Sequence, residues 1–502
     1  MVYLYTASQS QAVDTAASQQ IPVPGFELMR RAARYAFDTL LERWPDARSI
    51  NVWCGKGNNA GDAYLLAQLG HELGLQVRTL AVRDPGELSG DAKRAYLHAC
   101  EAGVSVEPWV AGDVVPSADV QVDGLLGTGI SGPPRAEISA AISEVNAQNG
   151  AILSIDLPSG VDGSTGTVPG EAVQAQVVTT FITHKVGSFT GPGLDYCADL
   201  CFSDLGVDAS AYLRPDVETV NFHQCRSLLA EPGVNAYKHQ QGHLVMCGGD
   251  LNMPGAIALA ARAGLRCGAG MVTCVTHPEN RTVIVGQTPE IMVCDVAQLK
   301  TRQADVFVLG PGLGRGSWSQ SLYESVEQYS AHANTPVVLD ADGLHWLAQK
   351  GAWRGGPLTI TPHVAEAAQL LDGDVPSVQA DRVAAARALA KRFGCHGVIK
   401  GAGSVVFSAE SAEVRICQDG NPGMATAGMG DVLSGMVAAM LGQSARERQS
   451  QPGGAQSMDR LCLSVCLHSA AADFALAKIP PLSLMASDVI DAVPGLLQEL
   501  RD

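Results

Sequence analysis

The sequence predicts two consecutive α/β domains, each built around a largely parallel sheet, and three observations support this fold class. The chain has 502 residues, which at roughly 150 residues per domain suggests two to four domains. In both halves, short apolar runs that end at turn residues alternate with segments of helical spacing, as in β-α-β units. The chain also contains 54 glycine residues, which allow many tight turns between strands and helices.

The composition excludes several classes of protein. Hydrophobic residues make up 46% of the chain and charged residues 17%, as in well-packed globular domains. The net charge of −17 argues against nucleic acid as a partner, although local N–H groups can still hold a small anion. The first residues lack the basic segment, apolar segment and cleavage site of a signal peptide, and no apolar run reaches the ~18 residues of a membrane span. We therefore expect a cytoplasmic protein without a membrane partner.

The 13 cysteines are scattered and include no C-x-x-C pair. Two pairs, Cys197/Cys201 and Cys462/Cys466, have a spacing that metal ligands sometimes show. Free thiols in a reducing compartment are the favoured interpretation.

In the first half, residues 49–55 (SINVWCG) and 151–158 (AILSIDLP) have the pattern of parallel strands. Residues 60–74 have helical spacing, which predicts a helix with Leu65, Leu66, Leu69 and Leu73 on one side. Few periodic signals occur near residues 213–228, so we place the link between the domains there.

In the second half the alternation of strands and helices restarts. The expected strands are HLVMC, MVTCVT, DVFVLG, PVVLD, PLTIT, GVIKG and SVVF, and the expected helices include PGAIALAARAGL, RVAAARALAKRF and GDVLSGMVAAML. Glycine-rich or polar motifs follow several of these strands: GGD, GPGLG, DADGL, TPHVAEA and KGAGS. Ligands of open α/β sheets bind beyond these strand ends, so the repeated placement indicates a phosphate-binding site. The P-loop motif G-x-x-x-x-G-K-[ST] is absent.

Asp431 directly follows Gly428 and Gly430 and precedes an apolar helical run. A carboxylate at this position can cap the helix. Alternatively, the glycine N–H groups hold a phosphate and Asp431 acts as a base beside it.

These motifs resemble known families. TAGMGDVLSG resembles the G-x-G-D anion hole of the ribokinase-like superfamily, and the ordered set of motifs over residues 225–502 resembles the ADP-dependent NAD(P)H-hydrate dehydratases. The resemblance implies a three-layer, ribokinase-like α/β/α domain that dehydrates hydrated NADH or NADPH with ADP, giving AMP and phosphate, with Mg²⁺ on the phosphate oxygens. By position, Asp431 is the general base. The hydrated nicotinamide is contacted by Ala256, Gly314, His363 and Asp431. The ADP site is formed by Lys400, Gly401, Ala402, Gly403, Ser404 and Gly430.

Some of these residues also have ordinary structural interpretations. Lys400 could be a solvated lysine at a strand end, and His363 could simply begin a helix. The family usually has Pro-Gly where this chain has Val364 and Ala365. His363 and Glu366 keep their spacing, so we expect the chemistry to be unaffected.

The first half contains a second group of polar strand ends. Residues 55–60 match G-x-G-x-x-A, a weak dinucleotide fingerprint for which Asp84 could bind the ribose. Such a turn does not need the paired amides of Asn58 and Asn59 or the carboxylate of Asp62. Further strand ends carry Asp123 and Asp156. Amide, hydroxyl and carboxylate oxygens suit a hard cation, and neutral ligands beside a single Asp favour a monovalent ion.

These stretches resemble the NAD(P)H-hydrate epimerases over residues 1–217, which implies a Rossmann-like three-layer α/β/α domain. By position, Asp156 is the catalytic acid or base, although it could instead cap the following turn. K⁺ is bound by Asn59, Asp123 and Ser159. The hydrated dinucleotide is contacted by Asn58, Asn59, Ala60, Gly61, Asp62, Gly127, Thr128, Gly129, Ile130, Ser131, Gly132, Pro133 and Asp156. Ala60 replaces a usual Gly, and residues 28–33 (LMRRAA) are more basic than the family's helix.

Together, the two resemblances imply a bifunctional enzyme that repairs hydrated nicotinamide cofactors. The N-terminal domain, residues 1–217, interconverts the (R) and (S) epimers, and the C-terminal domain, residues 225–502, dehydrates the (S) epimer. We expect NADHX, NADPHX and ADP as small-molecule partners, and a homo-oligomer. One alternative is a ribokinase-superfamily kinase of a vitamin-precursor alcohol with a non-catalytic N-terminal nucleotide-binding domain. Another is a binding scaffold with two inactive domains.

Overall fold

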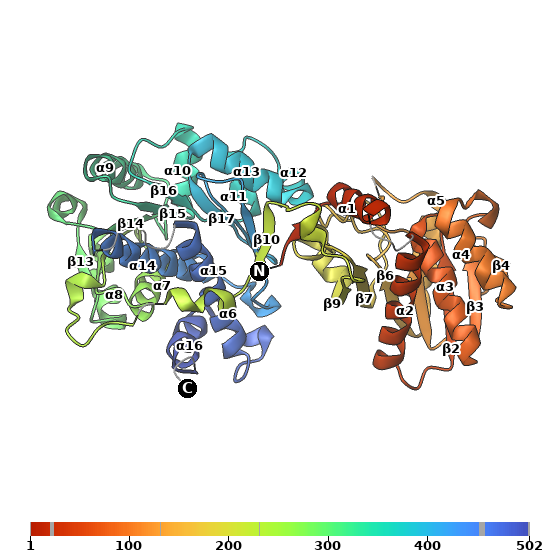
Figure 1. Ribbon diagram of the computed structural model, residues 1–502. Coiled ribbons are helices and arrows are strands. Elements are labelled where there is room, and N and C mark those ends of the chain that lie inside the picture. Colours follow the sequence, from red (N-terminus) through yellow and green to blue (C-terminus); the bar gives the residue numbers. More distant parts are fainter. Residues whose placement is uncertain (1, 21–24, 131, 230, 451–456, 500–502) are drawn as a thin grey trace. The chain divides into compact units, whose positions relative to one another are not determined.

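The computed structural model describes residues 2–20, 25–130, 132–229, 231–450 and 457–499. The chain forms two compact units, Val2–Val217 and Glu218–Asp502 (Figure 1). Among the described residues, no helix is both long and apolar enough to cross a membrane. Each unit is described by itself below.

The first unit contains a seven-stranded parallel sheet with the order β4-β3-β2-β5-β6-β7-β9. From the central β2, the chain first adds strands on one side and then continues from β5 on the other. In doubly wound sheets, the crevice beyond such a switch point binds the ligand. The strands are β2 (Ser49–Cys54), β3 (Gln76–Ala81), β4 (Val106–Pro108), β5 (Val120–Gly124), β6 (Ala151–Ile155), β7 (Ala175–Phe181) and β9 (Cys197–Ser203).

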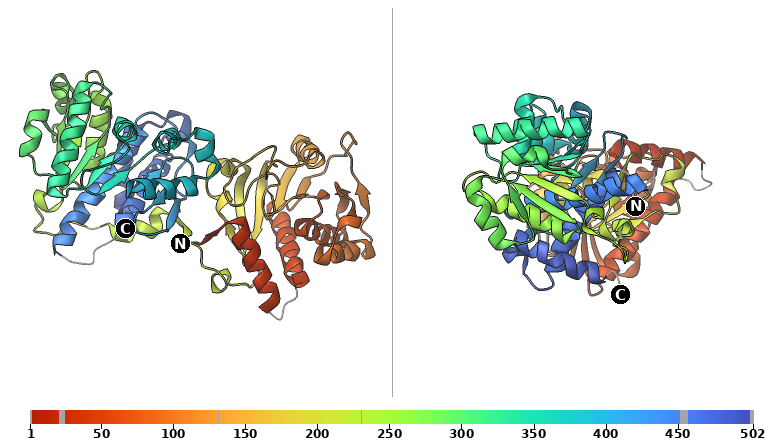
Figure 2. Two further views of the ribbon diagram at one scale, coloured as in Figure 1. Left: turned by 90° about the horizontal axis from the view of Figure 1, so that it is seen from above. Right: turned by 90° about the vertical axis from the view of Figure 1, so that its left-hand side faces the viewer.

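Helices cover both faces of this sheet (Figures 1 and 2). Alternate β2 residues point to opposite faces, so Ile50 and Val52 join one core cluster and Trp53 joins another. The three-layer α/β/α prediction is therefore confirmed for this unit. The first cluster packs under α2 (Gly25–Arg43), α3 (Asn58–Leu73) and α4 (Gly90–Glu101), and the second under α5 (Ala136–Ala147). The predicted helix is confirmed as α3; Leu65 and Leu66 are buried, whereas Leu73, in its last turn, is 58% exposed.

The N-terminal segment belongs to a separate two-stranded parallel sheet. In this sheet, β1 (Leu4–Tyr5) pairs with β8 (His184–Lys185). Helix α1 (Ala7–Gln20) follows directly. The Ala7 N–H donates to the Ser164 hydroxyl at 2.9 Å, and the Ser10 and Thr183 hydroxyls lie 2.7 Å apart. These contacts hold α1 against loops that follow β6 and β7.

The second unit contains a ten-stranded sheet with the order β10-β19-β18-β17-β16-β15-β14-β11-β12-β13. Strands β11 to β17 run parallel, whereas β18 and β19 are antiparallel to their neighbours. The switch point lies between β11 and β14. The strands are β10 (Val217–Val220), β11 (His243–Cys247), β12 (Met271–Val275), β13 (Met292–Cys294), β14 (Val306–Leu309), β15 (Val337–Leu339), β16 (Leu358–Ile360), β17 (His396–Ile399), β18 (Val405–Phe407) and β19 (Val414–Cys417).

Helices also flank this sheet on two faces (Figures 1 and 2). Val306 and Val308 of β14 join the core cluster under one helix layer. That layer contains α6 (Phe222–Cys225), α7 (Pro254–Arg266), α14 (Met429–Ser450), α15 (Ser457–Ala475) and α16 (Ala486–Glu499). The opposite layer contains α9 (Ser317–Ala333), α10 (Asp342–Lys350), α11 (Val364–Leu370) and α13 (Arg382–Phe393). Two short helices, α8 (Arg281–Gln287) and α12 (Val375–Ala380), complete the set. The predicted three-layer α/β/α arrangement is confirmed here too.

The structure adds strands that the sequence pattern does not indicate. Strands β13 and β19 each have only three or four residues, too few for a clear period. The region expected to be a link, 213–228, contains β10 and α6. Strand β10 pairs with β19, so tertiary pairing, rather than local propensity, makes it a strand.

Candidate active sites

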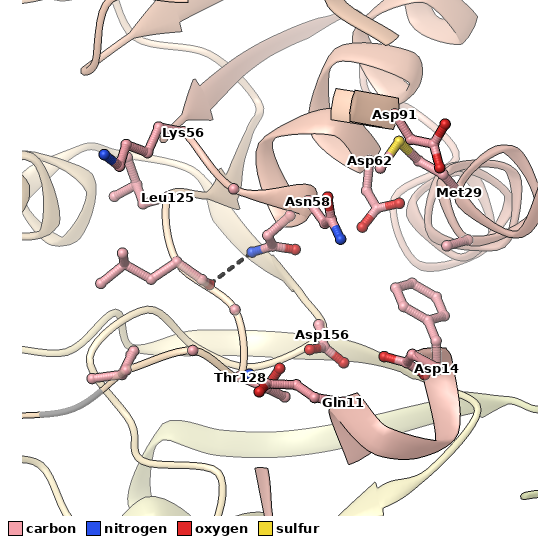
Figure 3. A pocket seen from close by; sticks show the side chains of 18 of the residues that line it. Gln11, Asp14, Met29, Lys56, Asn58, Asp62, Asp91, Leu125, Thr128 and Asp156 are labelled. Carbon is pink, nitrogen blue, oxygen red and sulfur yellow. Dashed lines mark hydrogen bonds between the residues drawn. The ribbon is translucent and has the colours of Figure 1, made fainter. Parts of the chain in front are cut away.

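A cavity of about 790 Å³ opens beyond the carboxyl ends of β2, β5 and β6, with α1 as one wall (Figure 3). Of the predicted substrate contacts, Ala60 and Gly61 do not line it. Ala60 is fully buried, and a Cβ on Gly61 would lie 2.7 Å from Met29 Sδ, because α2 packs there. Ser131 lies outside the described residues. The predicted contacts that line the cavity are Asn58, Asn59, Asp62, Gly127, Thr128, Gly129, Ile130, Gly132, Pro133 and Asp156.

Asp156 directly follows β6 and has an unusual backbone conformation. Its φ is +68°, which costs energy for a residue other than glycine and is concentrated at functional sites. Its N–H donates to Thr179 O at 2.6 Å, which fixes this turn to the neighbouring β7. The carboxylate faces the cavity and the carboxylate of Asp14 on α1 (Figure 3).

Lys185 of β8 lies under this carboxylate and was not predicted. Its Nζ donates to Asp156 Oδ1 at 2.5 Å, to Thr180 Oγ1 at 2.9 Å and to Phe181 O at 3.1 Å. Its side chain is only 2% exposed. A buried ammonium needs compensating charge, and Asp156 supplies it together with two nearby carboxyls.

Those two carboxyls belong to Asp14 and Asp62, both on the cavity wall. Burial raises the pKa of Asp14 to about 6, with a further rise from Asp156 and an opposing effect of Lys185. Burial, Asp156 and Asp14 raise the pKa of Asp62 well above its ordinary value, again opposed by Lys185. Three carboxyls therefore face one ammonium, and burial and mutual repulsion favour the protonated forms of Asp14 and Asp62. The site can give and take protons.

The three residues predicted to bind a cation converge just below the cavity. Asp123 is fully buried and accepts hydrogen bonds from the Ser159 hydroxyl at 2.6 Å and the Ser159 N–H at 2.8 Å. Asn59 Nδ2 donates to Leu126 O at 2.7 Å, whereas Asn59 Oδ1 is buried without a hydrogen-bond partner among the described residues. Burial raises the pKa of Asp123, opposed by the bonds from Ser159. Within the described ranges, the donors to Asp123 are neutral hydroxyl and backbone N–H groups. A carboxylate, a hydroxyl and an unpaired amide oxygen fit a monovalent cation.

The structure does not support the ribose-binding role that the weak dinucleotide fingerprint suggested for Asp84. Asp84 Oδ1 accepts a hydrogen bond from Gly86 N–H at 2.8 Å and begins a short 3₁₀ turn. It is not among the residues that line the cavity. Asp84 is a structural cap.

In the second unit, Asp431 lies in the first turn of α14, after Gly428, whose φ is +89°. The first N–H groups of a helix have no partner within the helix and favour an anion. A Cβ on Gly430 would lie 3.0 Å from Lys400 Nζ and 3.6 Å from Asp340 Oδ2. The glycine therefore lets the helix start approach the Lys400 ammonium.

The charged groups around Lys400 shift the pKa of Asp431. Lys400 Nζ donates to Asp340 Oδ1 at 2.7 Å and lies 3.7 Å from Glu366 Oε2. Burial lowers the pKa of Lys400, but Asp340, Glu366 and Asp431 outweigh it, and the net effect is a rise. Burial and the charges of Asp340 and Glu366 raise the pKa of Asp431 to about 7, with Lys400 opposing. A carboxyl that titrates near neutral pH suits a general base.

The 400–404 turn is positioned by buried Arg382, which sequence reasoning missed. Arg382 is 4% exposed and donates to Ala402 O at 2.6 Å and Ile399 O at 3.1 Å. Gly401 and Gly403 have φ values of +145° and +61°, which only glycine adopts freely. The Ser404 hydroxyl closes the turn on Gly401 O at 2.9 Å.

His363 begins α11 and is tied to Lys400 through Glu366. Its Nδ1 accepts from the N–H groups of Ala365 and Glu366 at 3.1 and 3.3 Å, and its N–H donates to Glu366 Oε2 at 2.7 Å. This reciprocal capping box forms with Val364 and Ala365 in place. The His363 side chain stays 54% exposed beside the charged cluster.

Gly314 and Ala256 lie at the switch point between β14 and β11. Gly314 has a φ of +76°, and its N–H donates to Asp342 Oδ2 at 3.0 Å. A Cβ there would lie 2.6 Å from Asp250 Oδ2. A Cβ on Gly312, in the same turn, would lie 3.2 Å from the Cβ of Ala256 on α7. The structure thus gathers all predicted contacts of this unit at the carboxyl ends of its parallel strands.

Comparison with known proteins identifies both units. The family described as NAD(P)H-hydrate dehydratase matches residues 244–494, and the family described as YjeF-related protein N-terminus matches residues 25–187. The chain is 36% identical to a bifunctional NAD(P)H-hydrate repair enzyme of Coxiella burnetii over 497 residues, covering 97% of this chain and 98% of the relative.

Solved structures agree on the fold. A ribokinase-like superfamily protein of Enterococcus faecalis is 24% identical, with a TM-score of 0.50, and covers 57% of this chain and 97% of its own. The ADP/ATP-dependent NAD(P)H-hydrate dehydratase of Bacillus subtilis, co-crystallised with ATP/Mg²⁺, is 24% identical, with a TM-score of 0.50, and covers 57% and 99%. The predicted ribokinase-like fold is confirmed. With near-complete coverage by its relatives and both domain families present in order, the chain belongs to the family of bifunctional NAD(P)H-hydrate repair enzymes.

Proposed function

We propose that the first unit interconverts the (R) and (S) epimers of hydrated NADH and NADPH, and that the second unit dehydrates the (S) epimer at the expense of ADP. One observation carries this proposal. Each unit places a carboxyl, Asp156 or Asp431, beside a lysine ammonium at the carboxyl ends of a parallel sheet. These are the positions at which members of this family are expected to carry out the two reactions.

In the first unit, the hydrated nicotinamide enters the cavity under α1. Asp156 gives and takes a proton at the substrate, and Lys185 holds its carboxylate in place. The raised pKa values of Asp14 and Asp62 favour their protonated forms, which can supply a proton beside Asp156. This supply lets the site act in both directions, as an epimerase must.

Asn59, Asp123 and Ser159 would hold K⁺. The unpaired Asn59 Oδ1 and the buried Asp123 without a cationic partner among the described residues support this assignment. When bound, the ion would supply positive charge beneath the loop after β5, whose residues 127–130, 132 and 133 line the cavity for the dinucleotide.

In the second unit, ADP would lie between the 400–404 turn and the N-terminus of α14. Asp431 takes the proton of the substrate hydroxyl, whose oxygen attacks the β-phosphorus of ADP and releases AMP. The C–O bond then breaks with phosphate as the leaving group, which departs more readily than hydroxide. Bound Mg²⁺ would neutralise charge on the phosphate oxygens.

The proposal is tested on the full chain with a mixture of both epimers of hydrated NADH, ADP and Mg²⁺, followed by the absorbance of reduced nicotinamide. The wild type should convert both epimers. Asp156→Asn should stop after the fast conversion of the (S) epimer, and Asp431→Asn should give no fast phase. Recovery without any nucleotide, or a stable phosphorylated alcohol as the product, would instead support the kinase alternative or another reaction.

The homo-oligomeric state and the cytoplasmic location stay predictions. Light scattering of the purified full chain and fractionation of the source cells would test them.

A further inference from the structure

The second unit contains a cluster of thiols that neither proposed reaction uses. Cys417 ends β19, Cys466 lies on α15 and Cys225 ends α6. The Sγ atoms of Cys417 and Cys466 are 3.5 Å apart, and Asp419 Oδ2 lies 4.0 Å from Cys417 Sγ. Potential ligand atoms of Cys417, Asp419 and Cys466 all lie within 4.8 Å of one another. Among the described residues, Cys225 is not part of this group of ligand atoms.

The distances match a metal site better than a disulfide. A disulfide requires sulfurs about 2.05 Å apart, whereas those of Cys417 and Cys466 are 3.5 Å apart. Two thiolates on a tetrahedral zinc ion, each with a bond of about 2.3 Å, are separated by about 3.8 Å. A carboxylate oxygen on the same ion lies about 3.6 Å from each sulfur, close to the 4.0 Å found for Asp419.

Burial and chemistry narrow the kind of ion. Cys417 and Cys466 are 2% and 0% exposed, so the thiols are buried, as those of structural metal sites are. Thiolates select soft or borderline ions such as Zn²⁺ over Mg²⁺. Asp419 is anchored by the Phe222 N–H, which donates to its Oδ2 at 2.6 Å.

The thiol one turn before Cys466 is differently engaged. Cys462 Sγ lies 3.9 Å from Arg415 Nη1, and Arg415 is ion-paired with Glu218 and Asp459. The Arg415 guanidinium lies beside the Cys462 sulfur, where a metal ion bound to that sulfur would have to lie. Cys462 is therefore not a ligand. The Cys462/Cys466 spacing in the sequence therefore points to the right helix but not to the pair of ligands.

We propose that Cys417, Asp419 and Cys466 bind one zinc ion. Each coordinating thiol releases its proton to solvent on binding. The ion would join the end of β19 to α15, and so fix the start of the segment that leads from Cys417 to Gly428 and Asp431. This inference does not depend on the proposed repair activity.

The test is the metal content of the full chain after expression with added zinc. Elemental mass spectrometry should find about one zinc per chain in the wild type and in Cys274→Ser, a matched control because Cys274 is a buried thiol of β12 in the same unit. Cys417→Ser and Cys466→Ser should lose the zinc. Asp419→Asn keeps the shape of the side chain and the acceptor for Phe222 N–H, and should weaken zinc binding at least about tenfold.

A spectroscopic measurement shows the ligands directly. Cobalt-substituted wild type should have a thiolate-to-cobalt charge-transfer band, which Cys417→Ser weakens and Cys274→Ser leaves unchanged. Zinc-free wild type with all 13 thiols free would overturn the proposal. So would a Cys417–Cys466 disulfide, which leaves 13 − 2 = 11 thiols, or full zinc affinity in Asp419→Asn.

Discussion

Lys400 donates a 2.7 Å hydrogen bond to Asp340, and so joins the ends of β17 and β15 across the intervening β16. The bond holds the ammonium against the backbone of Gly430, at the N-terminus of α14. A helix N-terminus and a lysine converge on one point, where both favour a phosphate. Asp431 shares this point, and its raised pKa follows from the same crowding of charge.

Replacing Asp431 tests its role as a base. Asp431→Asn should lower the dehydration rate by about 10²–10⁴, the range that general-base catalysis contributes, while epimerisation and ADP binding persist. Asp488→Asn is a matched control, because Asp488 also lies in the first turn of a helix, α16. The initial rate of reduced-nicotinamide formation measures the effect. Full activity in Asp431→Asn would disprove the mechanism.

The pKa of Asp431 also predicts a pH dependence. The base must be ionised, so kcat/KM for dehydration should rise with pH through about 7. For stability the sign is opposite. A carboxyl whose pKa is raised on folding stabilises the folded state while it is protonated, and this contribution is lost as pH rises through about 7. Asp431→Asn should therefore raise Tm more at pH 8 than at pH 6, measured by calorimetry without ligands.

Lys185 compensates three carboxyls in the first unit. Lys185→Met should abolish most epimerase activity and destabilise the unit, because Asp14, Asp62 and Asp156 then repel one another. Removing the ammonium raises the pKa values of Asp14 and Asp62 further. The variant's Tm should therefore recover more on acidification from pH 8 to pH 6 than that of the wild type. Lys93→Met, which changes an exposed lysine of α4 outside the cavity lining, should change neither property.

The cation site makes a separate prediction. K⁺ should raise the Tm of the wild type more than an equal concentration of a larger organic cation, because Asn59, Asp123 and Ser159 offer it oxygen atoms. Asn59→Leu removes the unpaired amide oxygen and should abolish the difference. Asn58→Leu is the matched control, because Asn58 is exposed at the first position of α3. An unchanged K⁺ response in Asn59→Leu would contradict the assignment.

Arg382 should act on ADP only through the turn it supports. Arg382→Met leaves the carbonyls of Ile399 and Ala402 without their donors, a loss of about 1–3 kcal/mol. The KM for ADP should rise roughly tenfold or more, with a smaller change in kcat. Arg387→Met changes an exposed arginine of the same helix, α13, and should leave the KM for ADP unchanged. Equal effects of the two substitutions would refute the role.

Strand-end motifs made most of the site predictable. Parallel strands such as β11 and β14 are continuous apolar runs, and the glycines after them mark the sharp turns beyond the sheet. Because every parallel strand presents its carboxyl end to the same edge, motifs far apart in sequence could be placed together. Asp340 lies within one such motif, DADGL, and could have been assigned a role from its position.

Lys185 and Arg382 could not be found in this way. Lys185 contacts Asp156, 29 residues away, and acts electrostatically on Asp14, on a helix at the start of the chain. Nothing in its local sequence distinguishes it from a solvated lysine. Arg382 is the first residue of an amphipathic helix, α13, and its sequence context predicts an exposed side chain. In the structure, α13 packs on β17 and β18, and Arg382 is buried. Tertiary packing buries this side chain, and the local hydrophobic periodicity of the sequence does not predict that burial.

Strand β10 has a practical consequence for separating the two reactions. It begins at Val217, yet it completes the edge of the ten-stranded sheet beside β19. A fragment that begins at residue 225 would expose the backbone hydrogen-bonding groups of β19, and such an unpaired edge favours aggregation. It would also lack Phe222, a buried residue of the core. Genes divided for independent expression should therefore be cut upstream of Val217, so that the downstream product keeps its outermost strand.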